Sequence, residues 1–335
     1  MKVGYFDNEA REYVITTPKT PVKWINYIGT RRFGGFVDHT GGTALCKDDP
    51  ALNRITWYVP QRPASAFNAT TLYLRLPKDG GYRVFSPLFV PTLGAYDRYD
   101  CHIGLGYTRV VSEYEGIRSD LTFFVPPHAG HEIPGPMLWD LRVTNLREHD
   151  AALDAIPVVE YSHPEAIKQF NNNDWVPQTM ISRVERENGG RLTLLQYPFM
   201  FKEIKVNYLT ANRPVTSFES ERRRCLGDDG YGTWADPKSL QRPELTNNEA
   251  KRGHNVGALM CPLGKLEPGE TRRLIVQLGQ APSFEAAKES IARYRDPEVV
   301  DAALDALKAA WASTLDRQQV RTPDEEIPRD RPAQV

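Results

Sequence analysis

The sequence carries almost no net charge. Its 42 lysine and arginine residues are balanced by 43 aspartate and glutamate residues, which leaves a formal charge of −1 at neutral pH. A chain without a net positive field has little attraction for a phosphate backbone or an anionic lipid surface. We therefore expect neither a nucleic-acid partner nor a membrane partner.

Long apolar runs are missing as well. No segment approaches the roughly 18 to 20 apolar residues that a membrane-spanning helix needs. The first residues, MKVGYFDNEAREY, lack the apolar core of a signal peptide. These two absences predict a cytoplasmic protein.

Cysteine is scarce, and its spacing excludes the common cysteine frameworks. Widely separated cysteines without a CxxC pair favour reduced, mostly buried thiols over a disulfide scaffold or a zinc site. The four residues are Cys46, Cys101, Cys225 and Cys261.

Motifs for catalysis and metal binding are also absent. The 43 acidic residues show no pattern that selects the two carboxylates of a glycoside hydrolase, and no nucleophile elbow marks a serine. His128 and His131 are close in sequence, but a third metal ligand is not in view. The residues alone therefore give no signal for a catalytic residue or a metal site.

The chain does contain a long series of short runs of β-forming residues. Turn residues at 7–10, 77–81 and 115–116 separate pairs of such runs and predict hairpins. No helix of ordinary length is expected between the runs. With 335 residues, 40 % of them apolar, the chain can bury a large core. The pattern predicts a mainly β fold, an antiparallel sandwich and not a parallel α/β sheet.

The periodicity changes near the end of the chain, where two helices are predicted. Ser283 is an N-cap candidate for the first, and Asp296 followed by Pro297 marks the start of the second. One apolar face of the second helix must lie on the sandwich, pair with another chain or stay partly exposed. Its members are Val300, Leu304, Leu307, Trp311 and Leu315.

Two segments are expected to be loops, and one carries a charge run. Prolines and glycines between residues 17 and 42 predict a conformationally demanding loop. The Gly-rich stretch 227–240 lacks the spacing of a phosphate-binding loop. The run Arg222-Arg223-Arg224 could hold an anion, although surface arginines more often form solvated or salt-bridged faces.

The segment 160–180, EYSHPEAIKQFNNNDWVPQTM, lies between two strand-like runs and is expected to leave the sheet. It mixes flat aromatic side chains with amides and charges. Such a mixture suits a sugar, which offers C–H faces to aromatic rings and hydroxyls to amides. The alternative is a surface turn in which residues 171–174 form local hydrogen bonds.

The order of several segments resembles a known family. GYFDNEAREYVIT, PKTPVKWINYIG, HTGGTALCKD and NRITWY follow one another as at the start of the glycoside phosphorylases typified by cellobiose, cellodextrin and chitobiose phosphorylases. LPKDGGYRVFSP, GLGYTRVVSEYEGIRSDLTFFVP and LGKLEPGETRRLIVQLG continue the match. The resemblance covers residues 1–325 of this sequence.

This resemblance implies a β-super-sandwich over residues 1–281, a helical linker over 282–320 and, beyond it, a catalytic (α/α)6 barrel. The charged, proline-containing tail 321–335 is expected to be disordered, and the sequence departs from the family at residues 327–335. We therefore expect a chain truncated before the barrel and inactive alone. The full-length family phosphorolyses β-linked glucosides reversibly, with inversion, to α-glucose 1-phosphate. It uses inorganic phosphate as co-substrate and no cofactor.

The resemblance also implies a role for the segment 160–180. Family members are homodimers in which sandwich loops of one subunit help to shape the acceptor-sugar site of the other. The resemblance reaches this segment only by region. Within it we expect Trp175 to stack on a sugar, Asn173 and Gln178 to bond its hydroxyls or a carboxylate, and Lys168 to attract an acidic acceptor such as gluconate.

Other interpretations remain open at this point. Trp175 could instead close the sandwich edge. The segment looks closer to the cellodextrin and cellobionate branch than to the chitobiose one. The alternative functions are a stand-alone carbohydrate-binding or dimerisation module and a complete enzyme with an unrecognised site.

Overall fold

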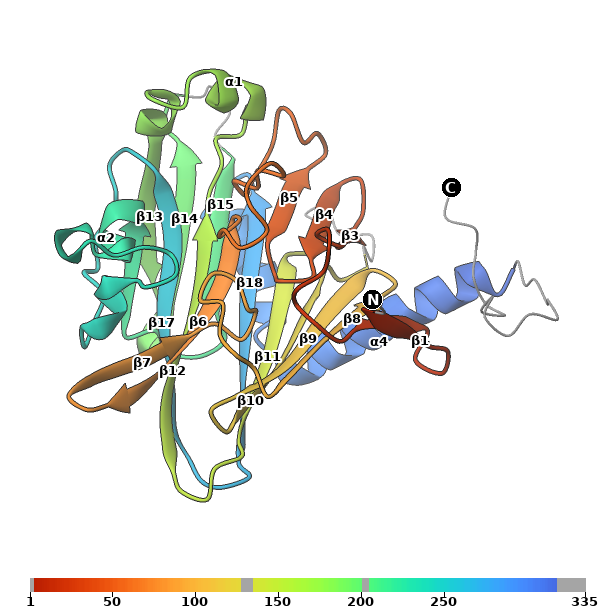
Figure 1. The fold of residues 1–335 in the computed structure, drawn as a ribbon. Helices are drawn as coiled ribbons and strands as arrows, with labels where there is room; N and C mark the ends of the chain where they lie inside the picture. The colour runs from red at the N-terminus through yellow and green to blue at the C-terminus, as the bar shows by residue number, and fades with distance from the viewer. Residues whose placement is uncertain (1–2, 128–134, 201–204, 318–335) are drawn as a thin grey trace.

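Antiparallel strands dominate the computed structural model, which describes residues 3–127, 135–200 and 205–317. The mainly β fold predicted from the turn-separated runs is confirmed. A ten-stranded sheet packs behind a five-stranded sheet, and a three-stranded sheet lies beside them (Figure 1). In spatial order the ten strands are β1 (Gly4–Asp7), β2 (Glu12–Ile15), β8 (Arg98–Gly104), β9 (Tyr107–Tyr114), β10 (Ile117–Phe124), β11 (Met137–Asn145), β18 (Thr271–Ala281), β15 (Val206–Ala211), β14 (Leu192–Pro198) and β13 (Met180–Arg186).

The two smaller sheets are also antiparallel throughout. In the five-stranded sheet the order is β16 (Ser217–Glu221), β17 (Asn255–Leu266), β12 (Ala151–Glu160), β6 (Thr70–Lys78) and β7 (Gly81–Phe85). The three-stranded sheet is β3 (Ile25–Gly29), β4 (Phe33–Asp38) and β5 (Thr43–Lys47).

The predicted hairpins form through the expected turn chemistry. The Asp7 carboxylate accepts a hydrogen bond from the amide of Ala10 at 2.9 Å between β1 and β2. Strands β6 and β7 are joined by two residues, Asp79 and Gly80, that both have positive φ. Two left-handed residues suit a type I′ turn, whose twist matches that of the flanking strands.

The main core lies between the sheets, and the ten-stranded sheet is buried on both faces. Phe123 and Phe124 are neighbours in β10 and point to opposite sides because side chains alternate along a strand. Phe123 belongs to the large core cluster between the sheets, whereas Phe124 packs under α4.

Two C-terminal helices cover the outer face of the ten-stranded sheet, with α4 crossing it in Figure 1. The predicted caps are confirmed: Ser283 accepts from the amide of Ala286, and Asp296 from that of Glu298. The helices of the described chain are α1 (Ala166–Asn171), η1 (Val176–Thr179), η2 (Asn188–Gly190), α2 (Arg222–Leu226), η3 (Asp228–Gly230), η4 (Lys238–Gln241), α3 (Phe284–Arg293) and α4 (Pro297–Leu315).

The apolar face of α4 lies on the sandwich. Val300 and Leu307 are buried against Tyr107 and Leu138 of the sheet, while Trp311 at the far end stays 37 % exposed. Charge pairing adds to this contact. Arg273 of β18 binds Asp140 of β11 at 2.7 Å and Asp301 of α4 at 2.8 Å.

The expectation of a loop over residues 17–42 was wrong in part, because this stretch contains β3 and β4. Glycine is depleted in strands, so its presence predicts a loop. Here it instead allows neighbouring strands to approach closely. A Cβ on Gly34 would lie 2.4 Å from the carbonyl oxygen of Ile28, and one on Gly35 would lie 1.8 Å from that of Ala44.

Three further expectations concern the burial of the cysteines, membrane-spanning helices and segments that lie outside the described residues. Cys101, Cys225 and Cys261 are buried free thiols, as predicted, and Cys46 is partly exposed. Within the described ranges, no helix combines the length and hydropathy needed to cross a bilayer. His128, His131 and the tail 321–335 lie outside the described residues.

Candidate functional site

The predicted sugar-binding segment leaves the sandwich between β12 and β13, as expected, and contains α1 and η1. Its inner side is tied down by buried polar contacts. The Gln169 side-chain oxygen accepts from the amide of His163 at 2.5 Å, and the amide of Ala166 donates to the carbonyl of Ala51 at 2.9 Å. These bonds fix α1 on the sandwich and leave its outer side facing solvent.

All four predicted sugar-binding residues lie on that exposed side. Lys168 pairs with Glu165 at 3.1 Å, three residues earlier on the same segment. Asn173 and Gln178 are exposed, and Trp175 is 47 % exposed, so it does not close the sandwich edge. The structure therefore places them where a ligand could reach them, and their role in sugar binding stays a prediction.

The same end of the molecule carries large exposed apolar side chains, which we call the α1 surface. The segment 160–180 meets two other segments there. The amide of Ala166 donates to the carbonyl of Ala51, and the amide of Phe199 donates to the carbonyl of Thr179. Scattered exposed apolar residues are ordinary, but a cluster of them marks an interaction site. The members of the α1 surface, each between 45 % and 68 % exposed, are Leu52, Ile167, Phe170, Trp175, Phe199 and Met200.

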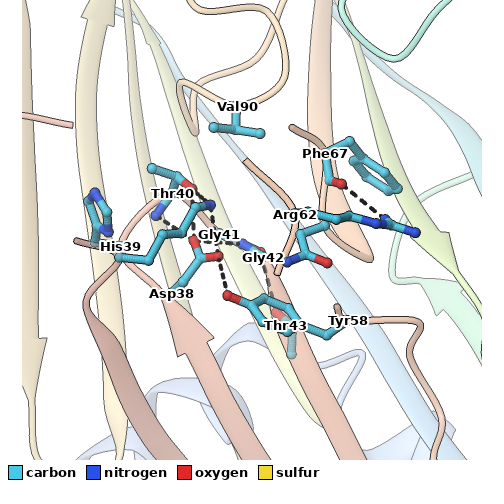
Figure 2. Close-up of polar contacts among 12 residues, drawn as sticks. Asp38, His39, Thr40, Gly41, Gly42, Thr43, Tyr58, Arg62, Phe67 and Val90 are labelled. Carbon is cyan, nitrogen blue, oxygen red and sulfur yellow. Dashed lines mark hydrogen bonds and ion pairs between the residues drawn. The ribbon is translucent and has the colours of Figure 1, made fainter. Parts of the chain in front are cut away.

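Asp38 is the centre of a buried polar cluster at the turn between β4 and β5 (Figure 2). Its Oδ1 accepts from the backbone amide of Thr40 at 2.8 Å, from the Thr40 hydroxyl at 2.7 Å and from the amide of Gly42 at 3.2 Å. Its Oδ2 accepts from the Tyr58 hydroxyl at 3.1 Å and pairs with Lys23 Nζ at 3.0 Å. These partners occupy the carboxylate, which therefore shapes the turn and is not available as a general base.

His39 is fully engaged as well. Its Nδ1 accepts from the amide of Trp24 at 3.2 Å, which leaves the proton on Nε2 to be donated to the carbonyl of Pro18 at 3.0 Å. Burial lowers the pKa of the imidazole. A neutral histidine with both nitrogens bonded can serve neither as a metal ligand nor as a proton acceptor in this conformation.

Glu160, the last residue of β12, is a second buried carboxylate. It binds Arg62 at 3.3 Å and Arg222 at 3.2 Å, and so joins three segments that are distant in sequence. Burial, followed by the charge of Arg222, lowers the pKa of nearby His254 to about 4. Because Glu160 is held between two guanidinium groups, it anchors the base of the segment 160–180.

The arginine run at 222–224 forms ion pairs. Arg222 binds Glu160, Arg223 binds Asp228 at 2.7 Å, and Arg224 binds Glu221 at 3.0 Å. Each guanidinium thus has a carboxylate partner, which confirms the salt-bridged interpretation over an anion site.

Sequence reasoning did not identify Asp38, Lys23 or Glu160. A weak signal existed for the first, because Asp followed two residues later by Thr and then by Gly-Gly is typical of a turn closed by the aspartate side chain. Pairs such as Asp38 with Lys23, on different strands, depend on the fold and leave no local pattern.

Comparisons of the sequence place this chain among known proteins. Residues 11–297 match the model of the glycosyl hydrolase 94 supersandwich domain. The chain is 29 % identical over 331 residues to N,N'-diacetylchitobiose phosphorylase of Vibrio proteolyticus and 29 % identical over 334 residues to that of Vibrio furnissii; each alignment covers 97 % of this chain. It is 26 % identical over 325 residues to 3-O-beta-D-glucopyranosyl-beta-D-glucuronide phosphorylase of Paenibacillus borealis, again over 97 % of this chain.

In each case the matched region is 39 % of the relative's own length. These names support a similarity to disaccharide phosphorylases in general. They do not single out the cellobiose, cellodextrin or cellobionate type that the sequence suggested, since two of the three relatives are chitobiose phosphorylases.

Proposed function

This chain belongs to the glycosyl hydrolase 94 supersandwich domain family, and from that premise we propose that it is the sandwich domain of a glycoside phosphorylase, a protein that exchanges a β-linked glycosyl unit between a sugar acceptor and inorganic phosphate. The proton donor and the phosphate site would lie in a separate catalytic domain. Asp38, His39 and Glu160, which have their partners within the sandwich, take no part in the chemistry.

The α1 surface carries this proposal. Its half-exposed tryptophan lies on one rigidly attached segment, 160–180, together with exposed amides and a lysine that are not members of the surface itself. An indole face packs against the C–H face of a pyranose, while amide groups both donate and accept, as sugar hydroxyls require. We propose that Trp175, Asn173 and Gln178 contact the acceptor sugar and that Lys168 serves an acidic acceptor.

Trp175→Ala tests this role once the sandwich is joined to a phosphorylase catalytic domain. The KM for the acceptor sugar is expected to rise about tenfold, the usual cost of losing an aromatic contact area, with little change in the KM for glucose 1-phosphate. Phosphate release from glucose 1-phosphate in the presence of each acceptor measures both constants.

Tyr231→Ala is the matched control for that experiment, because Tyr231 is 93 % exposed and lies on the loop after α2. An unchanged acceptor KM in Trp175→Ala would remove the α1 surface from the acceptor site. The sandwich alone is expected to form no glucose 1-phosphate from β-glucosides and phosphate. Formation of this product by the purified chain would overturn the proposal.

We also propose that the members of the α1 surface other than Trp175 are covered by a second copy of the chain. Its exposed leucine, isoleucine, phenylalanine and methionine side chains favour a protein partner, and a chain whose net charge is only −1 meets little repulsion from its own copy. In such a dimer the polar residues of the segment would face the partner's sugar site.

Ile167→Glu is expected to weaken self-association at least tenfold, because a carboxylate would be buried without a partner in the interface. Sedimentation equilibrium of the purified chain measures the effect. Val22→Glu is the control, since Val22 is similarly exposed but lies outside the α1 surface. Equal association of both variants, or a wild-type chain that stays monomeric at high concentration, would contradict the dimer.

A further inference from the structure

A cavity of about 490 Å³ opens beside the start of β8. One wall is the turn that follows β2, residues 16–19, and the other is the segment 94–100 that leads into β8. Its volume falls within the range of about 300 to 1,000 Å³ typical of small-ligand sites. None of the predicted sugar-binding residues lines it.

The second wall is held in a fixed shape. The hydroxyl of Tyr96 donates to the carbonyl of Ser86 and accepts from the amide of Phe89, and the amide of Leu93 binds the carbonyl of Phe89 at 2.7 Å. Phe89 and Leu93 both have left-handed backbones, with φ of 69° and 53°. Bulky residues adopt this conformation at a cost, and such residues concentrate at binding and catalytic sites.

The charges around the cavity are arranged for a neutral ligand. Lys19 and Arg98 supply two positive charges, and Asp97 and Asp100 supply two negative ones. Arg98 and Asp100 bind each other at 2.6 Å. The ammonium of Lys19 and the carboxylate of Asp97, by contrast, make no hydrogen bond or ion pair to any part of the chain that the structure describes.

We propose that this cavity is a binding site for an uncharged pyranoside. Lys19 and Asp97 are both exposed. A sugar hydroxyl can accept from the Lys19 ammonium while another donates to the Asp97 carboxylate, so one neutral polyol can replace the water at both groups. An anion would meet Asp97 and Asp100, and a cation would meet Lys19 and Arg98. The Pro18 ring and the Ala95 methyl group, both in the lining, offer apolar contact to the sugar's C–H face.

This site does not depend on the proposed phosphorylase role, because binding here requires neither phosphate nor a second domain. The test is a titration of the purified chain with cellobiose, in which alanine methyl groups carry ¹³C and the Ala95 resonance is assigned with an Ala95→Gly variant. The Ala95 methyl signal is expected to shift and saturate. Lys19→Met and Asp97→Asn should each weaken binding about tenfold, the loss expected for one hydrogen bond to a charged group.

Lys78→Met and Glu289→Gln are matched controls, because both residues are exposed and lie away from the cavity. They should leave the affinity unchanged, and all four variants should melt like the wild-type chain, since neither Lys19 nor Asp97 holds another part of the fold. Glucuronate and glucosamine, which keep the pyranose ring and carry opposite charges, should each bind more weakly than glucose.

Three results would overturn the proposal: an Ala95 signal that does not move up to the solubility limit of cellobiose, an affinity that neither Lys19→Met nor Asp97→Asn lowers, or tighter binding of a charged sugar. None of them would bear on the Trp175→Ala experiment, which reports acceptor kinetics at the α1 surface.

Discussion

Asp38→Ala is expected to lower the free energy of unfolding by about 3–5 kcal/mol, the usual cost of removing one partner from a buried ion pair. The carboxylate is buried, and Lys23, its cationic partner, has a side chain that is only 17 % exposed. Alanine would also leave the Tyr58 hydroxyl and the amides of Thr40 and Gly42 without their acceptor. Each unsatisfied buried donor adds to the cost.

Urea unfolding with linear extrapolation measures this effect. Asp38→Asn should cost less, because an amide oxygen can still accept from the turn amides while the charge attraction to Lys23 is lost. Asp228→Ala is the matched control: its ion pair with Arg223 is exposed on both sides, so the change should stay below about 1 kcal/mol. A value for Asp38→Ala as small as the control would show that the cluster in Figure 2 does not hold the turn.

The elements that sequence reasoning predicted are those whose signals are local. The two-residue turns before β7 and β10 contain residues that tolerate positive φ, and they form tight hairpins. The caps at Ser283 and Asp296 lie within three residues of the amides they bind. In each case the residues that determine the structure are adjacent in the chain.

The elements that sequence reasoning missed depend on contacts between distant residues. Gly34 and Gly35 are residues typical of loops, yet they lie within β4. Glycine occupies these positions because the neighbouring backbone leaves no room for a Cβ. The cavity beside β8 likewise forms only when the turn after β2 meets the segment 94–100. No local pattern reports such a meeting.

The same limit applies to the candidate site. Sequence placed Trp175 and Gln178 in an excursion from the sheet, and the structure exposes both. The sequence could not show that Leu52 and Phe199 lie near them. These two residues come from other segments, which backbone hydrogen bonds hold next to the segment 160–180. The apolar character of the α1 surface is therefore a property of the fold.

Arg75→Met is the second substitution with a large expected effect, about 3–5 kcal/mol of unfolding free energy. Arg75 is buried in β6 and its Nε binds Asp154 of β12 at 2.7 Å. Its two Nη atoms donate to the carbonyls of Leu240 at 3.2 Å, Arg242 at 2.6 Å and Pro243 at 2.8 Å. Methionine fills similar space but leaves one carboxylate and three carbonyls without donors.

The loss of stability should affect one loop before it affects the whole fold, because the three carbonyls all belong to that loop. Amide hydrogen exchange of residues 238–242 is expected to accelerate in Arg75→Met, while β11 and β18, which belong to the ten-stranded sheet and not to the sheet of Arg75, keep their protection. Arg75→Lys should recover part of the stability, since an ammonium has three donors but cannot reproduce the planar fork. Equal loss of protection in the loop and in β11 would contradict the idea that this arginine pins η4 and the residues after it to the five-stranded sheet.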